Sequence, residues 1–156
     1  MRVRIIAVGR AKHGPEATLI TDYLTRFDRT GRAIGLGPAA VTEVEDRKGQ
    51  GQAAEAQLLL AAIPDGATVV ALDERGKTLN SPRFADMLGR YRDDGARECV
   101  FVIGGADGLT EPVRARASML LSFGTMVWPH MLARVMLAEQ LYRAATILTG
   151  GPYHRA

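Results

Sequence analysis

The chain has 156 residues, of which 47% are hydrophobic and 24% charged, and its formal net charge is +3 at pH 7. This length favours a single domain, which we place over residues 1–156, and the apolar content is sufficient for one buried core. The longest apolar run, near residues 58–63, is far shorter than the roughly 20 residues that cross a bilayer, so we expect no membrane anchor.

Charge is distributed unevenly along the sequence. Residues 1–32 contain seven basic and three acidic residues, residues 33–100 eight and eleven, and residues 101–156 five and three. The two basic ends are compatible with a polyanionic partner such as RNA, although a solvated surface explains them equally well. The single cysteine, Cys99, opens an apolar run and is expected to be a buried structural thiol, which fits a reducing cytoplasm.

Apolar periodicity and turn residues predict alternating strands and helices. In chain order we expect a strand over residues 3–8, a helix over 16–26, a strand over 41–44, a helix over 52–63, a strand over 68–72, a helix over 81–92, a strand over 99–103, a two-turn helix after residue 110, a strand over 119–121 and a helix over 130–148.

Local signals predict how several of these helices begin and which faces they bury. In the first helix, Leu19, Tyr23 and Phe27 lie on one face at helical spacing. Ser81, followed by proline, has the signature of an N-cap, and Thr110 is expected to cap the short helix in the same way. These assignments give each helix an apolar side for packing against strands.

Strands that alternate with helices through short connections predict an α/β fold with a mostly parallel sheet sandwiched by helices. Ligands of such sheets bind beyond the carboxyl ends of the strands. Leu72, the pair Gly104 and Gly105, and residues 122–125 all follow apolar strands, and residues 73–77 are expected to form a loop. Three strand ends should therefore lie side by side at one ligand site.

The sequence excludes several familiar sites. The run GGADG after the fourth strand lacks the spacing and position of a dinucleotide loop, and no phosphate-binding GxxxxGK[ST] motif is present. His13, His130 and His154 are scattered, so no metal site is expected. What remains is binding of an adenine-sized group through main-chain atoms, which glycine permits because it allows close approach.

Several longer segments together carry a family resemblance. They are RIIAVGR near the start, VVALDERGK in the middle, FVIGGADGL and LSFGTMVWPHMLARVMLAEQLYRA in the second half, and GGPYHR at the end. On these segments the chain resembles, over nearly its full length, the small SPOUT methyltransferases of the RlmH type. That family is described as 23S rRNA pseudouridine-N3 methyltransferases.

The resemblance implies a C-terminal deep trefoil knot, an exception to the rule that chains do not thread through themselves. It also implies that the knot loops bind S-adenosyl-L-methionine, and we expect Gly105→Val to fill space that this cofactor uses. Trp128 lies in a segment that departs from the family pattern, and it either rims the pocket or packs against a partner. The expected donor-binding residues are Leu72, Gly104, Gly105, Gly124, Thr125, Met126, Val127, Trp128 and Pro129.

The resemblance further implies a homodimer packed through the last helix, with an RNA site built from both subunits. The C-terminal tail then carries the expected catalytic residues. We assign proton handling to His154, contact with phosphate or carbonyl to Arg155, and stacking on or orientation of the base to Tyr153. The expected substrate is 23S rRNA, on which the enzyme is expected to act in the assembled ribosome.

Other side chains near these motifs have two readings each. His130 begins a helix and is expected to shape the preceding loop rather than to act as a base. Arg134 and Arg143 on the last helix either reach the partner or RNA, or are simply solvated. Four basic residues near the start of the chain either extend the RNA surface or are simply solvated: Arg2, Arg4, Arg10 and Lys12.

Two other functions fit parts of the sequence. A non-catalytic RNA-binding or ribosome-assembly module on the same fold would need the basic ends but not the donor loops. A flavodoxin-like mononucleotide protein is disfavoured because no phosphate cradle follows the first strand. Binding of S-adenosyl-L-methionine separates the methyltransferase from the RNA-binding module, and a yellow colour on purification would favour the flavodoxin-like protein.

Overall fold

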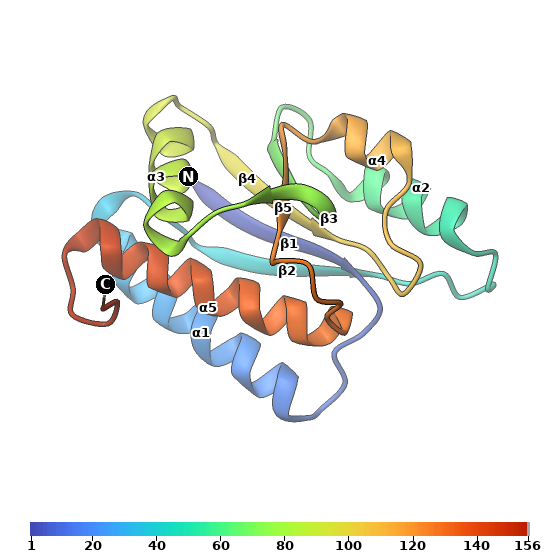
Figure 1. Cartoon of the computed structure of the whole chain (residues 1–156), viewed down its shortest axis with the longest axis horizontal. Helices are drawn as coiled ribbons and strands as arrows, with labels where there is room; N and C mark the ends of the chain where they lie inside the picture. Colours follow the sequence, from blue (N-terminus) through green and yellow to red (C-terminus); the bar gives the residue numbers. More distant parts are fainter. Residues whose placement is uncertain (156) are drawn as a thin grey trace.

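The computed structural model describes residues 1–155, which form a five-stranded sheet with helices on both faces (Figure 1). The strands lie in the order β2-β1-β4-β3-β5, and every neighbouring pair is parallel, as predicted. The elements are β1 (Arg2–Val8), α1 (Pro15–Gly31), the short 3-10 helix η1 (Arg32–Ile34), β2 (Ala39–Val44), α2 (Gln52–Ala62), β3 (Thr68–Thr78), α3 (Ser81–Asp93), β4 (Glu98–Ile103), α4 (Glu111–Arg116), β5 (Met119–Ser122) and α5 (His130–Thr149).

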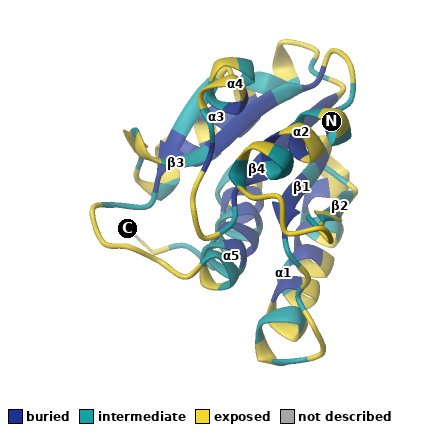
Figure 2. Ribbon diagram, turned by 90° about the vertical axis from the view of Figure 1, so that its right-hand side faces the viewer, coloured by how far each residue is buried: buried dark blue, intermediate teal, exposed yellow. Residues whose placement is uncertain are grey.

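The sheet is buried on both faces because alternate strand residues pack against different helices. In β1, Val3, Ile5 and Ala7 join the core formed with α1, α3 and α5, whereas Ile6 and Val8 join the core formed with α2 and α4. Burial along the central strands is visible in Figure 2, where β1 and β4 are mostly dark blue. This two-sided packing explains why the strands are continuous apolar runs rather than alternating ones.

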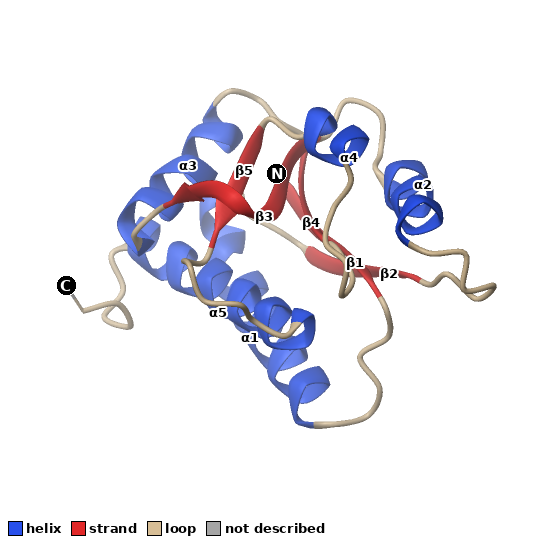
Figure 3. Cartoon of the chain, turned by 45° about the vertical axis from the view of Figure 1, so that its right-hand side comes forward, coloured by secondary structure: helices blue, strands red, loops and turns tan. Residues whose placement is uncertain are grey.

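Strand β3 is longer than the sequence analysis predicted, and the loop expected over residues 73–77 is wrong. The strand continues to Thr78 and curves across β5 (Figure 3). Leu121 of β5 pairs with both Leu72 and Lys77 of β3, with a register shift between them. The polar sequence DERGK suggested a loop, but pairing with β5 keeps this segment in the sheet.

Gly76 lies where β3 and β5 approach closely. A Cβ atom on this residue would lie 2.5 Å from the carbonyl carbon of Leu120 and 2.7 Å from the nitrogen of Leu121. Separations below 3.0 Å to main-chain atoms require the backbone to shift. Glycine is therefore needed at this crossing because it has no side chain.

The buried face of the first helix was predicted only in part: Phe27 is buried and Tyr23 packs against the core, but Leu19 is not buried. Ile20, Leu24 and Phe27 are buried, whereas Leu19 is 42% exposed and Tyr23 is only half-buried. The helix also extends at both ends, from Pro15 to Gly31. The true apolar stripe lies one residue further along, because Ile20 and Leu24 face the sheet together with Phe27.

Both predicted N-caps also differ from the structure. Asn80, not Ser81, caps α3, and its Oδ1 accepts a hydrogen bond of 2.9 Å from the amide of Arg83. Ser81 is the first helical residue, and its hydroxyl donates to Oε1 of Gln140 in α5. Thr110 occupies the cap position of α4 without making the capping bond, and its hydroxyl oxygen is buried without a partner among the described residues.

Cys99 is confirmed as a buried thiol at the start of the central strand β4. Its side chain is fully buried, and burial raises the pKa of the thiol to about 12. Within residues 1–155, no helix combines the length and apolar character needed to cross a membrane.

Candidate functional site

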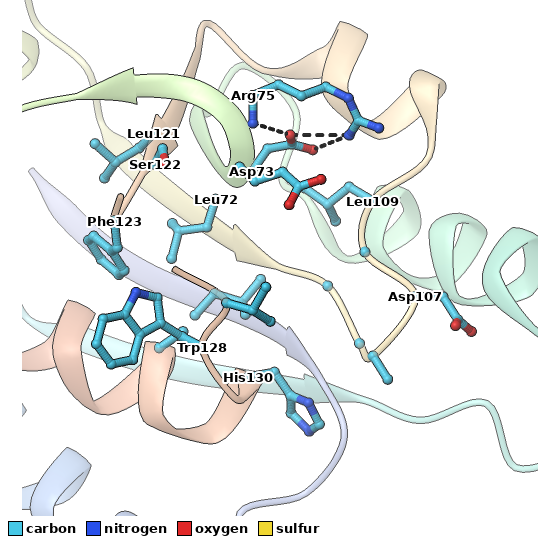
Figure 4. A pocket seen from close by; sticks show the side chains of 18 of the residues that line it. Leu72, Asp73, Arg75, Asp107, Leu109, Leu121, Ser122, Phe123, Trp128 and His130 are labelled. Carbon is cyan, nitrogen blue, oxygen red and sulfur yellow. Dashed lines mark hydrogen bonds and ion pairs between the residues drawn. The ribbon is translucent and has the colours of Figure 1, made fainter. Parts of the chain in front are cut away.

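A cavity of about 350 Å³ lies at the carboxyl ends of β4 and β5 and beside residues 72–75 in the middle of β3; these three strands are neighbours in the sheet (Figure 4). The sequence analysis expected three strand ends to meet here; the ends of β4 and β5 do, whereas β3 passes the cavity and continues to Thr78. Seven of the nine predicted donor-site residues line the cavity, and Thr125 and Pro129 do not. The seven are Leu72, Gly104, Gly105, Gly124, Met126, Val127 and Trp128.

The wall after β4 is a tight turn. The amide of Gly108 donates to the carbonyl oxygen of Gly105 at 3.0 Å, and Gly108 has a positive φ of 77°, which favours glycine. Gln52 at the start of α2 donates its side-chain amide to the carbonyl of Asp107 at 2.7 Å. The turn is therefore held by its own backbone and by α2, and it presents main-chain groups to the cavity.

The direction in which a Cβ atom would leave Gly105 corrects the expectation that a valine there would fill the cavity. A Cβ atom at Gly105 would lie 3.2 Å from both carboxylate oxygens of Glu55 and 3.3 Å from Cγ1 of Val8. Neither of these residues lines the cavity. A valine at this position would therefore press on α2 and β1 and displace the turn, rather than fill the cavity itself as the sequence analysis expected.

Residues 122–129 form the wall after β5. The hydroxyl oxygen of Ser122 accepts a bond of 3.1 Å from the amide of Gly124, whose φ is +111°. Trp128 lines the cavity and is 41% exposed, so it rims the pocket. Pro129 instead caps α5, where its carbonyl accepts the amide of Ala133.

Asp73 is a cavity residue that the sequence analysis missed. Its side chain is 4% exposed, and its Oδ1 accepts the amide of Arg75 at 2.8 Å. Arg114 approaches its other oxygen at 3.8 Å. A buried carboxylate in a cavity wall is suited to accept hydrogen bonds from ligand hydroxyl groups. The signal was an aspartate directly after a buried strand, which the loop assignment for residues 73–77 obscured.

Glu55 stands behind the turn that follows β4. Burial raises the pKa of this carboxyl group, and the nearby charges of Asp107 and Asp46 raise it further. Negative charge therefore gathers on the α2 side of the turn. Such a field favours a cationic ligand over an anionic one in the adjoining cavity.

Arg134 in α5 is buried and does not reach solvent, so both earlier readings of this residue are wrong. Its guanidinium pairs with Glu43 of β2 at 2.5 Å and donates to the carbonyl oxygen of Gly9 at 3.2 Å. Glu43 also accepts the amide of Ala11 at 2.6 Å. These bonds tie the first turns of α5 to the ends of β1 and β2. His130, one turn earlier, lines the cavity.

A second cavity, of about 730 Å³, adjoins the first. Residues 121–124 line both cavities and form their common wall. The second cavity is otherwise bounded by α1, by the connection from β3 to α3, by α5 and by His154. Of the three predicted catalytic residues, His154 lines this cavity, and Tyr153 and Arg155 line neither cavity within a single chain.

The tail packs on α5 through several specific contacts. The hydroxyl of Tyr153 donates to Glu139 at 3.0 Å, and its ring lies 4.6 Å from that of Tyr142 between centroids. Burial, followed by the bond with Glu139, raises the pKa of Tyr153 to about 12. Arg143 contacts His154 and Glu139, so it is engaged within its own chain, whereas Arg155 is exposed.

The predicted basic surface is divided between two ends of the sheet. Arg2 and Arg4 lie on β1, which runs from there toward the cavity end, and Arg4 pairs with Glu98 at 2.9 Å. Arg10 and Lys12 follow β1 and therefore lie at the cavity end, where Arg10 pairs with Glu45 at 3.3 Å. Only the second pair is on the side of the candidate site.

A parallel sheet with main-chain turns around a cavity at its carboxyl ends defines a class of α/β proteins that bind nucleotide-like ligands. A family described as "Predicted SPOUT methyltransferase" matches residues 1–154. The chain belongs to this SPOUT methyltransferase family.

Full-length relatives narrow the position within the family. The protein named Ribosomal RNA large subunit methyltransferase H from Dinoroseobacter shibae is 66% identical over 155 residues, which cover 99% of this chain and 99% of the relative. The protein of the same name from Ruegeria pomeroyi is 65% identical with the same coverage. The resemblance seen in the sequence segments is thus confirmed over the whole chain.

Solved structures agree on the fold at much lower identity. A structure titled as a probable methyltransferase from Bordetella pertussis Tohama I has a TM-score of 0.56 at 18% identity, covering 92% of this chain and 94% of that one. A probable methylase family protein from Haemophilus influenzae Rd KW20 has a TM-score of 0.52 at 13% identity, covering 99% and 70%. At these identities the similarity concerns the fold alone.

Proposed function

We propose that this chain is an S-adenosyl-L-methionine-dependent methyltransferase that acts on N3 of a pseudouridine in 23S rRNA, in the cytoplasm and on assembled ribosomes. Membership of the SPOUT family and the names of relatives above 60% identity support this proposal. The observation that carries it is the convergence of the turns after β4 and β5 with residues 72–75 of β3 on one cavity.

The residues around the first cavity fit the proposed cofactor. Main-chain groups of Gly104, Gly105, Gly124 and residues 126–128 are available to a base edge, and Leu72 and Trp128 offer apolar walls. Asp73 is available to ribose hydroxyl groups. When bound, the cofactor supplies a methyl group on a positively charged sulfur, and the carboxylates behind the turn favour that charge. The residues have mainly to position the reactants.

The proposal includes a deep trefoil knot and a homodimer packed through α5. In that dimer, Tyr153, His154 and Arg155 of one protomer meet the donor cavity of the other. Two observations support the arrangement. Within one chain His154 lines the second cavity instead of the first, and large apolar side chains near the start of α5 are exposed. No metal takes part in the proposed reaction.

Titration calorimetry with S-adenosyl-L-methionine tests the donor site. We expect binding at one site per chain, and a matched titration with adenosine alone should be weaker because the sulfonium is missing. Absence of measurable binding would favour the non-catalytic RNA-binding module. Transfer of labelled methyl groups to large-subunit RNA in ribosomes that lack the modification then tests the reaction.

Removing the C-terminal tail separates the two parts of the proposed site. A chain truncated after Pro152 should bind the donor almost normally and lose methyl transfer, because the tail contributes to the reaction and not to the donor cavity. Calorimetry and labelled methyl transfer measure the two effects. Full activity of the truncated chain would rule out a role for the tail.

A further inference from the structure

The hydrogen bond between Arg143 and His154 fixes which nitrogen of the histidine ring carries hydrogen. Nη1 of Arg143 lies 3.2 Å from Nδ1 of His154. A guanidinium group has only donors, so Nδ1 must accept this bond through its lone pair. In a neutral imidazole the hydrogen then sits on Nε2. Turning the ring over would replace the bond with a carbon facing the guanidinium, so the observed orientation is also the favourable one.

Arg143 is itself held rigidly in place. Glu139, one turn earlier on α5, accepts its Nη2 at 2.6 Å and its Nε at 3.0 Å. Its guanidinium carbon lies 4.8 Å from the centre of the Tyr153 ring, a cation–π distance. The hydroxyl of Tyr153 returns to Glu139. Arg143 therefore has little freedom to release the nitrogen of His154.

The other side of the histidine ring is available to a ligand. His154 lines the second cavity, and no group among residues 1–155 forms a hydrogen bond with its Nε2. The second cavity shares residues 121–124 with the proposed donor cavity. A donor N–H is thus presented toward open space, which leaves it available to a substrate held at the donor cavity of the other protomer in the proposed dimer.

We propose that Glu139 and Arg143 act as positioning residues that hold His154 as the Nε2–H tautomer, so that His154 donates a hydrogen bond to a uracil-type carbonyl oxygen and does not accept the N3 proton. This inference rests on the proposed function and changes the proton-handling role predicted for His154. The N3 proton passes to water. The negative charge left on the ring is shared with the carbonyl oxygens beside N3, where the Nε2–H bond stabilises it.

Substitutions of His154 test the donor role directly. Glutamine places an amide N–H near the position of Nε2 but cannot act as a base, whereas asparagine places its amide near Nδ1. We expect His154→Gln to keep kcat within roughly tenfold of the wild type, and His154→Asn and His154→Ala to lose roughly 100-fold, as for a lost hydrogen bond to a charged group. Equal losses in the glutamine and alanine variants would overturn the proposal.

Nitrogen-15 spectra of the histidine rings test the tautomer without any enzymatic reaction. In the full-length protein, His154 should show hydrogen on Nε2 and an unprotonated Nδ1. Arg143→Met should raise the share of hydrogen on Nδ1, whereas Arg143→Lys, which keeps a donor, should raise it less. Hydrogen on Nδ1 in the wild-type protein would contradict the proposal.

The two tests separate this inference from the proposed function. If the wild-type chain binds no S-adenosyl-L-methionine and methylates no RNA, the proposed function fails, whatever the ring spectra show. If the chain is active but His154 carries hydrogen on Nδ1, only the positioning role fails. In Arg143→Met we expect kcat to fall with donor affinity unchanged, which a general loss of structure would not produce.

Discussion

Arg134 shows how a single buried side chain connects distant parts of the molecule. It is 1% exposed, and its guanidinium joins α5 to Glu43 on β2 and to the end of β1. Burial by itself raises the pKa of Glu43, but the bonds from Ala11 and Arg134 outweigh that effect and leave the pKa lowered. The pair therefore stabilises the folded chain at neutral pH.

Replacing Arg134 with methionine should destabilise the protein by about 2–3 kcal/mol, because Glu43 and a main-chain carbonyl lose a charged donor. Urea unfolding at pH 7 measures the loss. The difference from wild type should shrink as the pH falls through the lowered pKa of Glu43, where protonation weakens the pair in the wild type as well.

Arg10→Met is the matched control for this variant. Arg10 also pairs with a glutamate, but its side chain is 60% exposed, so its loss should change stability by no more than about 0.5 kcal/mol. Equal effects of the two substitutions would show that burial of Arg134 does not matter.

The functions of single residues were the least predictable from the sequence. The glycine-rich strand ends indicated the cavity, because glycines after apolar strands have few other uses. Arg134 was uncertain because its partner Glu43 lies 91 residues away, and no local pattern reveals such a contact. Asp73 was missed because its burial depends on Arg75 and Arg114. The roles of the glycines could be predicted from the local sequence, whereas the ion pairs join residues that no local pattern connects.

At the scale of elements, the crossing of β3 and β5 depends on Gly76. The main chains approach so closely there that a Cβ atom would overlap the backbone of Leu120. The same crossing places Leu72 beside residues 121–124, and these segments line the proposed donor cavity. Packing of the two strands and the shape of the cavity are therefore linked.

Gly76→Ala should lower the free energy of unfolding by about 1–3 kcal/mol, because the added methyl group forces two backbones apart. It should also weaken donor binding through the displaced cavity wall. Chemical denaturation and calorimetry measure the two effects. Gly14→Ala serves as the control, since its Cβ would meet nothing closer than 3.7 Å. Wild-type behaviour of Gly76→Ala would remove the requirement for glycine.

Element types were predicted well from the sequence where a local pattern determined them. The five strands and the parallel sheet followed from apolar runs between helices. The extension of β3 was not predictable, because its polar residues stay in the sheet only through pairing with β5. The cap of α3 was misplaced by one residue, since both Asn80 and Ser81 are good capping residues and only the observed bond decides between them.

At the scale of the whole molecule, an exposed apolar surface lies where the proposed homodimer would pack. Met126, Val127 and Trp128 are 74%, 89% and 41% exposed, and Leu132 in the first turn of α5 is 43% exposed. Single exposed apolar side chains are common, but four within seven positions are typical of an interface. This surface adjoins the proposed donor cavity, which fits a site completed by a partner.

In the proposed homodimer, Leu132→Glu should shift the chain from dimer to monomer without unfolding it, because a charge would be placed in the interface. Light scattering measures the mass, and methyl transfer should fall together with it. Leu58→Glu is the control, since Leu58 is similarly exposed, at 38%, but lies on α2 across the sheet. A stable dimer in Leu132→Glu would place the interface elsewhere.

The burial of Cys99 gives the protein an internal reporter of its own opening. With its pKa raised to about 12 and no access to solvent, the thiol cannot react with an alkylating reagent while the chain is folded. Labelling therefore requires the centre of the sheet to separate. Since the sequence holds one cysteine, the rate at which it is modified in dilute reagent measures how often each variant unfolds, with no added probe.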